Sequence, residues 1–165
     1  MFIGAEMKGE SKSTFVQLRD RSGSQDPNAE SCAGPNLEVN VIYTTVPGTV
    51  AALKTADELG VDLGARVFFL VPQSVPLSFP LTSPPVSVSF TEERFRSMAT
   101  VCQEAAQVRV RVLLCRDKLQ GLLKFLKPQS VVVVGGRKRW WLTPEEKLAR
   151  VLKSNGHRVI FVDGK

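Results

Sequence analysis

Hydrophobic and polar positions change their period repeatedly from residue 37 onward, and each change predicts a new element. Residues 37–44, LEVNVIYT, alternate and are rich in β-branched and aromatic side chains, which predicts a strand. Pro47 and Gly48 then open a segment with an apolar stripe at three- and four-residue spacing, which predicts an amphipathic helix. The stripe consists of Val50, Leu53, Ala56, Leu59 and Leu63.

The alternation of strand and helix patterns continues to the end of the chain. Further strands are predicted at residues 65–71, 108–115, 130–136 and 158–162. Further helices are predicted from residue 91, at residues 117–126 and at residues 144–155, with Gly156 as the C-terminal stop of the last one. The prolines between residues 72 and 90 predict that the second strand ends at Pro72 and that an extended crossover without helix or central strand follows.

Five strands that alternate with four helices predict an α/β fold. Parallel strands need long crossover connections, and these crossovers are right-handed. We therefore expect a three-layer α/β/α architecture around an open, parallel, five-stranded sheet. Ligands of such sheets bind outside the carboxyl ends of the strands, near the point where the strand order reverses.

Residues 1–36 differ in composition from the rest of the chain. They are rich in Ser, Gly, Asp, Asn, Glu and Lys and carry only short apolar groups, which predicts a disordered tail. A start codon assigned ahead of the domain would give the same pattern. Residues 37–165 are long enough to bury one ordinary core, so we expect a single α/β domain there.

The charge of the chain lies in the predicted domain. Residues 37–165 hold eighteen Lys and Arg against eleven Asp and Glu, a net charge of +7, whereas residues 1–36 have a net charge of −1. A basic domain favours anionic partners such as nucleotides, nucleic acid or a membrane surface, although net charge also serves solubility.

Cysteine usage and hydropathy indicate the compartment. The three cysteines are far apart in sequence, without a C-x-x-C pair, so neither a disulfide framework nor a metal site is predicted. The N-terminus lacks the apolar region of a secretion signal, and no apolar run approaches the roughly 20 residues of a membrane span. We expect a cytoplasmic protein with no membrane partner.

The most informative segment is residues 130–147, SVVVVGGRKRWWLTPEEK, in which a buried strand runs into a glycine pair, a basic aromatic stretch and a helix start. Candidate ligand contacts at this edge are Gly135, Gly136, Arg137, Lys138 and Arg139, together with Thr44, Thr45 and Gly48 from the turn after the first strand. Glycines allow close backbone approach and the cations suit phosphate. Trp140 and Trp141 either stack on a ligand or anchor a subunit interface.

The order of these elements resembles the universal stress protein family, whose fold is of the adenine nucleotide α-hydrolase type. The resemblance covers about residues 37–163 and rests on T-x-P-G-T after the first strand, V-P after the second, C-R-D after the third and V-G-G after the fourth. It implies the strand order 3-2-1-4-5. It also implies ATP or another adenine nucleotide as ligand and a homodimer formed along the fifth strand, residues 158–162.

The sequence departs from the family's nucleotide-binding motifs at several positions, so the resemblance is that of a divergent member. Nucleotide-binding members of the family hold ATP with an Asp after the first strand, where this chain has Thr44. Their G-x-x-G loop after the fourth strand matches Gly135 but places its second glycine at Lys138, and the later Gly-Ser or Gly-Thr pair falls on Leu148-Ala149. Most of the family's phosphate-binding loop is therefore missing.

The start of the fourth helix also differs from an anion site. Thr143-Pro144-Glu145-Glu146 predicts a capping box with proline at the first helical position, which occupies amides that could otherwise receive phosphate. Arg137, Lys138 and Arg139 just upstream can offset the two carboxylates if their side chains turn inward.

We therefore predict a non-catalytic, universal stress protein-like binding or regulatory protein with a degenerate nucleotide or anion site. No catalytic residue and no metal ligand is predicted, because the edge lacks a histidine or paired carboxylates. A nucleotide-acting enzyme of the same fold and a scaffold protein without ligand are the alternatives. Specific nucleic-acid binding is not expected, because three cations without a recognition helix are too few.

Overall fold

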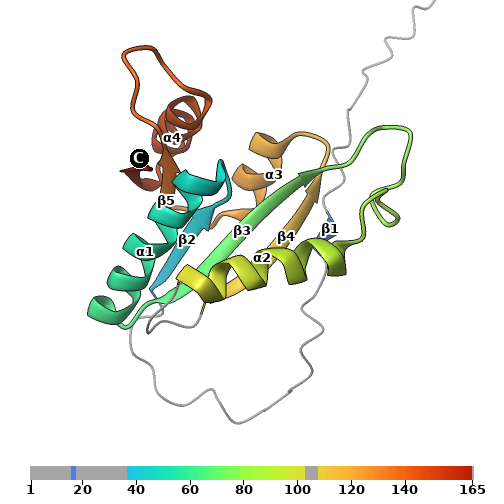
Figure 1. Ribbon diagram of the computed structural model, residues 1–165. Helices are drawn as coiled ribbons and strands as arrows, with labels where there is room; N and C mark the ends of the chain where they lie inside the picture. Colours follow the sequence, from blue (N-terminus) through green and yellow to red (C-terminus); the bar gives the residue numbers. More distant parts are fainter. Residues whose placement is uncertain (1–15, 18–36, 103–107, 165) are drawn as a thin grey trace, which may run out of the picture.

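The computed structural model describes residues 16–17, 37–102 and 108–164 (Figure 1). Its strands are β1 (Val16–Gln17), β2 (Glu38–Ile42), β3 (Arg66–Ser74), β4 (Val108–Cys115), β5 (Val131–Gly136) and β6 (Arg158–Asp163). Its helices are α1 (Val46–Leu63), α2 (Val88–Cys102), α3 (Lys118–Phe125) and α4 (Pro144–Ser154). None of these helices is long and apolar enough to cross a membrane.

The strands form one sheet in the order β1-β4-β3-β2-β5-β6. The five strands from β2 to β6 pair in parallel, so the predicted parallel sheet with the order 3-2-1-4-5 is confirmed. An additional short strand, β1, pairs antiparallel with β4 at the edge, and the sequence did not predict it. The predicted tail, residues 1–36, otherwise lies outside the described residues.

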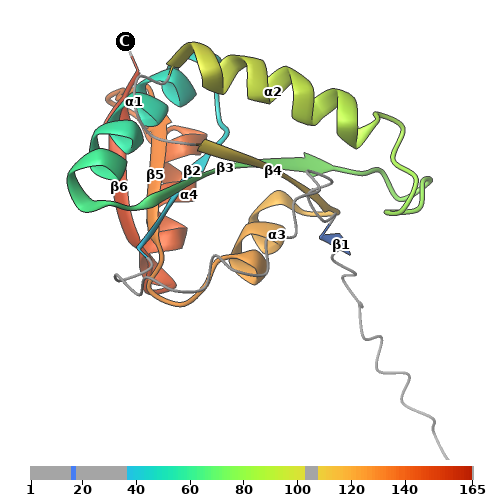
Figure 2. The same ribbon diagram turned by 90° about the horizontal axis from the view of Figure 1, so that it is seen from below.

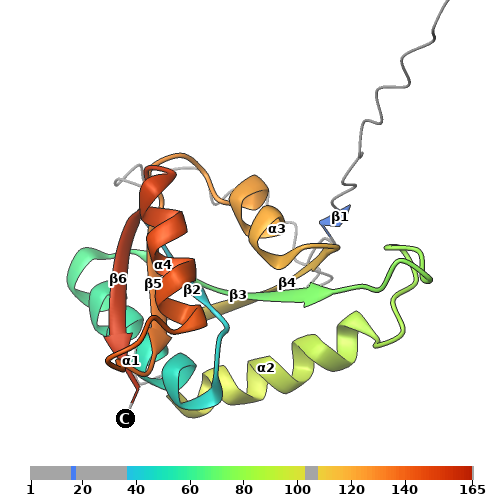
Figure 3. The same cartoon turned by 90° about the horizontal axis from the view of Figure 1, so that it is seen from above.

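Helices cover both faces of the parallel sheet, with α1 and α2 on one face and α3 and α4 on the other (Figures 2 and 3). Neighbouring residues of a strand therefore enter different cores. Phe69 lies in the cluster under α1 and α2, whereas Phe68 lies in the cluster under α3 and α4. This is why the strands have nearly continuous apolar runs such as the valines of β5.

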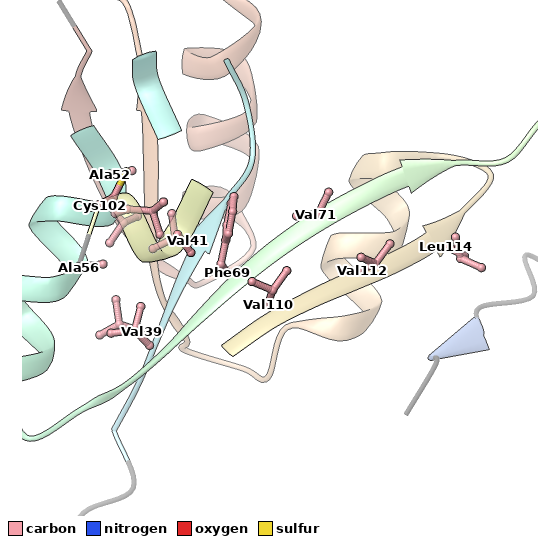
Figure 4. Packing of buried hydrophobic residues seen from close by; sticks show 14 of the residues in the cluster. Val39, Val41, Ala52, Ala56, Phe69, Val71, Cys102, Val110, Val112 and Leu114 are labelled. Carbon is pink, nitrogen blue, oxygen red and sulfur yellow. The ribbon is translucent and has the colours of Figure 1, made fainter. Parts of the chain in front are cut away.

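Aromatic rings and aliphatic side chains fill the core between the sheet and α1 and α2 (Figure 4). The ring of Phe95 on α2 meets Phe69 on β3 edge to face at 5.8 Å between centroids, and Tyr43 at 4.6 Å. Val39, Val41 and Phe69 are completely buried. The core thus fixes α1 against β2 and β5, between which the strand order reverses, and α2 against β4.

The prediction that β3 ends at Pro72 was wrong, because the strand continues to Ser74. The Leu70 carbonyl accepts a hydrogen bond from the amide of Tyr43, which directly follows β2. The Val75 amide instead donates to the Cys115 carbonyl of β4. By the two-residue alternation of a strand, the missing N–H of Pro72 faces the β2 side, where β2 has already ended. Proline therefore interrupts no hydrogen bond of the sheet here.

The prediction that residues 72–90 contain no helix was also wrong, at the C-terminal end of this range. Helix α2 begins at Val88, three residues before the predicted start. The carbonyl of Ser87 accepts hydrogen bonds from both the amide and the hydroxyl of Thr91, each at 3.1 Å, which closes a helical turn directly after the last proline. The remaining crossover, residues 75–87, is shorter than expected.

Candidate functional site

The turn after β2 and the turn after β5 lie against one another at the carboxyl edge of the sheet. The Thr44 hydroxyl donates a hydrogen bond of 2.6 Å to the Gly135 carbonyl, and the Thr44 amide donates to the Thr49 hydroxyl at 3.2 Å. Because β2 and β5 are parallel neighbours, both strands deliver their ends to the same place. The two halves of the sequence-predicted site are thus brought together.

The glycines of the two turns make the contact between them possible. A Cβ atom on Gly48 would lie 2.6 Å from the Gly135 carbonyl oxygen, and one on Gly164 would lie 2.6 Å from the Cα atom of Gly48. The Gly164 amide also donates to the Gly136 carbonyl at 3.0 Å. The start of α1, the end of β5 and the segment after β6 therefore pack backbone against backbone, with no space for a ligand between them.

Gly136 has a comparable role toward α4. A Cβ atom at this position would lie 2.6 Å from the Cβ atom of Glu145 and 3.2 Å from the ring of Phe161. The first turn of α4 thus approaches β5 closely because residue 136 has no side chain. Three of the predicted ligand contacts, Gly48, Gly135 and Gly136, are occupied by contacts within the protein.

A pocket of about 350 Å³ lies beside this junction, between the starts of α1 and α4 and the loop that joins β5 to α4. Its lining residues are Thr45, Pro47, Arg137, Arg139, Trp141, Thr143, Pro144 and Glu145. Of the sequence-predicted site residues, Thr45, Arg137, Arg139 and Trp141 line the pocket. Thr44, Gly48, Gly135, Gly136, Lys138 and Trp140 are not in its lining.

Both helices turn their N-terminal ends toward the pocket. In α1, Thr45 is the N-cap and its hydroxyl accepts from the Gly48 amide at 3.4 Å. In α4, the predicted capping box is present, since Glu146 donates its amide to the Thr143 hydroxyl at 3.3 Å and accepts from the Thr143 amide at 3.2 Å. The partial positive charges of two helix ends therefore converge on one pocket.

The caps leave few amides for a ligand. Pro47 and Pro144 have no N–H group, and the cap hydroxyls satisfy Gly48 and Glu146. Within the described residues, the amides of Val46 and Glu145 are the first-turn donors that these caps do not use. Of these two amides, that of Glu145 belongs to a lining residue of the pocket, beside the guanidinium groups of the loop, whereas Val46 lies next to the lining residues Thr45 and Pro47.

The loop over the pocket is basic and aromatic. The Lys138 amide donates to the Asp163 carboxylate at 3.2 Å, which ties the loop to the end of β6. The Arg139 guanidinium lies 5.3 Å from the centre of the Trp141 ring, a distance at which cation and ring attract. Arg137 and Arg139 give the lining two positive charges, and Glu145 gives it one negative charge.

Two further polar residues, Asp117 and His157, have structural positions. Asp117 caps α3 by accepting from the Gln120 amide at 2.8 Å. His157 is buried at the start of β6, at the end of the sheet away from the pocket. No group of three or more potential metal-ligating side chains occurs in the described parts of the chain.

Sequence reasoning missed Pro47, Thr143, Pro144 and Glu145 as lining residues. Thr143, Pro144 and Glu145 were recognised only as parts of a helix start. A signal was present, because parallel strands place the starts of the following helices at the same edge as the strand ends. Asp163, which holds the loop backbone, had no local signal in the sequence, because it acts across a distance of 25 positions.

No family model and no curated protein sequence matches this chain. A solved structure of a universal stress protein from Archaeoglobus fulgidus is similar in fold, with a TM-score of 0.50 and 12% sequence identity. The similarity covers 78% of this chain and 98% of that chain. At this identity it is a similarity of fold alone. The chain therefore has the fold of a universal stress protein, as its order of elements indicated.

Proposed function

We propose that this chain is a non-catalytic, universal stress protein-like binding or regulatory protein whose ligand occupies the pocket between α1 and α4. The ligand class is a small anion, and an adenine nucleotide with a short phosphate chain fits the proposal best. The fold similarity to a universal stress protein supports the general class. The pocket itself supports the kind of ligand.

The observation that carries the proposal is the convergence of positive groups on one concave site. Two helix N-termini and the side chains of Arg137 and Arg139 border the same pocket of about 350 Å³. A volume of this size lies within the range of small-molecule sites, roughly 300–1,000 Å³. Trp141 adds an apolar wall, as expected for a ligand with an organic part beside its charge.

The same geometry favours a short phosphate chain over a triphosphate. The space between the β2 and β5 turns is closed by the Thr44–Gly135 hydrogen bond and by the backbone contact of Gly48 with Gly135. Glu145 adds a negative charge to the lining, which opposes every further phosphate. A single phosphate near Arg137 and Arg139 meets more attraction than repulsion.

Isothermal titration of the full chain with AMP, ADP, ATP and inorganic phosphate tests the proposal. We expect binding with affinity that falls from AMP to ATP, and each of Arg137→Ala and Arg139→Ala should weaken AMP binding by about tenfold. Arg109→Ala is the matched control, because Arg109 is an exposed arginine near the start of β4, at the opposite end of the sheet. Absence of heat with all four compounds would contradict the proposal, and nucleotide turnover would favour the enzyme alternative.

We also propose that two copies associate along β6. Among the described strands, β6 is at the edge of the sheet and pairs with β5 only, and it has Ile160 exposed on one side with Phe161 and Val162 half-buried. An uncovered edge strand with apolar side chains favours pairing with another chain. The molar mass in solution decides between monomer and dimer, and Ile160→Lys should shift a dimer toward monomer.

A further inference from the structure

Three consecutive apolar side chains are exposed at the end of the basic loop. Trp140, Trp141 and Leu142, which we call the aromatic tip, have exposed fractions of 93%, 51% and 39%. The loop between β5 and α4 that contains them projects from the edge of the sheet (Figure 1). Single exposed apolar residues are ordinary, but adjacent tryptophans at a projecting loop indicate a contact surface.

Cations directly precede the aromatic tip. Arg137, Lys138 and Arg139 are all exposed. Three carboxylates lie near the base of the loop, and two of them are held there: Asp163 accepts the Lys138 amide and Glu146 accepts the Thr143 amide. Glu145, the third, faces the pocket. The exposed end of the loop therefore combines positive charge with aromatic surface, on a domain whose net charge is +7.

We infer that the aromatic tip docks on the surface of an anionic lipid bilayer. Tryptophan is enriched at the boundary between lipid headgroups and hydrocarbon, where its ring is apolar and its N–H remains hydrated. Each Lys or Arg beside it gains attraction from anionic headgroups. The tip requires no membrane-spanning helix, because a surface contact buries only a few side chains at the boundary.

The geometry of the rings favours a bilayer over a single-stranded nucleic acid. Bases bind to flat aromatic faces on which they can stack. Here the two indole rings are tilted by 58° at 5.3 Å, and the Arg139 guanidinium already covers one face of Trp141. The two tilted rings offer no common flat face to successive bases, whereas their exposed apolar surface suits the boundary between headgroups and hydrocarbon.

This inference departs from the sequence-based expectation of no membrane partner, which rested on the absence of a span. The docking surface shares Arg137, Arg139 and Trp141 with the lining of the proposed ligand pocket, but it also has residues of its own. Trp140 and Lys138 are outside the pocket lining, so changes at these two positions test the docking surface without removing a ligand contact.

The chain provides its own reporter for this surface. Its two tryptophans are both in the aromatic tip, so intrinsic tryptophan fluorescence of the full chain reports on this loop alone. We expect a blue shift when phosphatidylserine-containing vesicles are added, and quenching by lipids brominated on the acyl chains. Pure phosphatidylcholine vesicles should give a much smaller shift, and added salt should reduce binding to the anionic vesicles.

Co-sedimentation with the same vesicles measures the contribution of each side chain. Trp140→Ala should lower the partition coefficient by about tenfold, which corresponds to roughly 60 Å² of ring surface withdrawn from water. Lys138→Ala should lower it by about fivefold. The matched controls are Leu77→Ala, an 87% exposed apolar residue in the β3–α2 crossover, and Lys153→Ala, an exposed cation near the end of α4. Both should bind like the unchanged protein.

Three results would overturn the inference. The first is the absence of a shift with anionic vesicles. The second is equal partitioning of Trp140→Ala, Lys138→Ala and the two controls. The third is a blue shift that appears with a single-stranded oligonucleotide, or at a higher concentration of the protein itself, but not with vesicles. That result would assign the tip to nucleic acid or to a second copy of the chain.

Discussion

A methyl group on Gly48 would meet the backbone of Gly135, and a methyl group on Gly136 would meet the side chain of Glu145. A glycine pair in a sequence indicates only that some atom comes very close to the backbone. Whether that atom belongs to a ligand or to another part of the protein is decided by tertiary packing. This is why the sequence placed these glycines in a ligand site and the structure places them in packing contacts.

Residues whose partners are close in sequence were predictable. The Thr143–Glu146 box caps α4, as its spacing indicated, because a cap needs only the next three residues; Asp117 caps α3 in the same local way. It was not predictable in detail that the basic loop and the start of α1 line one pocket. The loop contributes Arg137, Arg139 and Trp141, and the helix start contributes Thr45 and Pro47. This arrangement depends on how a loop folds back over two helices that are far apart in the chain.

Cys115 allows a prediction about proton binding by a single residue. Its thiol lies near the Gln73 carbonyl, at 3.7 Å between sulfur and oxygen. Burial raises the pKa of this thiol above its ordinary value, and the negative charge of Asp117 raises the pKa further. In a variant in which Cys32 and Cys102 are replaced by Ala, Cys115 should react with iodoacetamide at least about tenfold more slowly when folded than in urea.

The raised pKa of Cys115 also makes the free energy of unfolding depend on pH in a defined direction. Below the ordinary pKa of 9.0, the thiol is protonated in both states and the free energy of unfolding does not depend on it. As the pH rises past that value, the unfolded chain loses the proton first, so the folded state becomes less stable. Equal alkylation rates in the folded and unfolded protein would contradict a buried, protonated thiol.

At the scale of elements, the strands and helices were predictable because each has a regular period. The valines of β5 and the run VFFL in β3 indicated strands covered on both faces, and two helical layers cover them. The errors lie at Pro72 and Val88. Proline was treated as a stop signal, but its effect depends on whether a neighbouring strand needs the missing N–H, and β2 ends before that point.

The hydrogen bond between Thr44 and Gly135 connects two elements and can be tested by substitution. Thr44→Val keeps the shape of the side chain but removes the hydroxyl that donates to the Gly135 carbonyl. We expect the free energy of unfolding to fall by about 1 to 2 kcal/mol, because the carbonyl at this partly buried position loses its donor. Urea unfolding measures the change.

Thr82→Val provides the control for this substitution, since Thr82 is exposed in the crossover before α2. It should change the free energy of unfolding by less than about 0.5 kcal/mol. If Thr44→Val is as stable as Thr82→Val, the hydrogen bond does not hold the two turns together.

At the scale of the whole molecule, the parallel sheet determines where a site can form. Five parallel strands deliver the starts of α1 and α4 to one edge, and this much followed from the alternation of elements in the sequence. The sequence did not indicate that the junction itself is filled by backbone contacts. The pocket is consequently displaced from the glycine turns to the adjoining basic loop.

The most direct test of a phosphate-binding pocket between the two helix starts is an amide NMR titration of isotope-labelled protein with AMP. We expect saturable shifts at the amides of Thr45 and Glu145 and at the Trp141 indole, because all three residues line the pocket. The amide of Arg158, at the opposite end of the sheet, should not shift. Shifts confined to residues outside the pocket, or no shifts at saturating AMP, would contradict the proposed site.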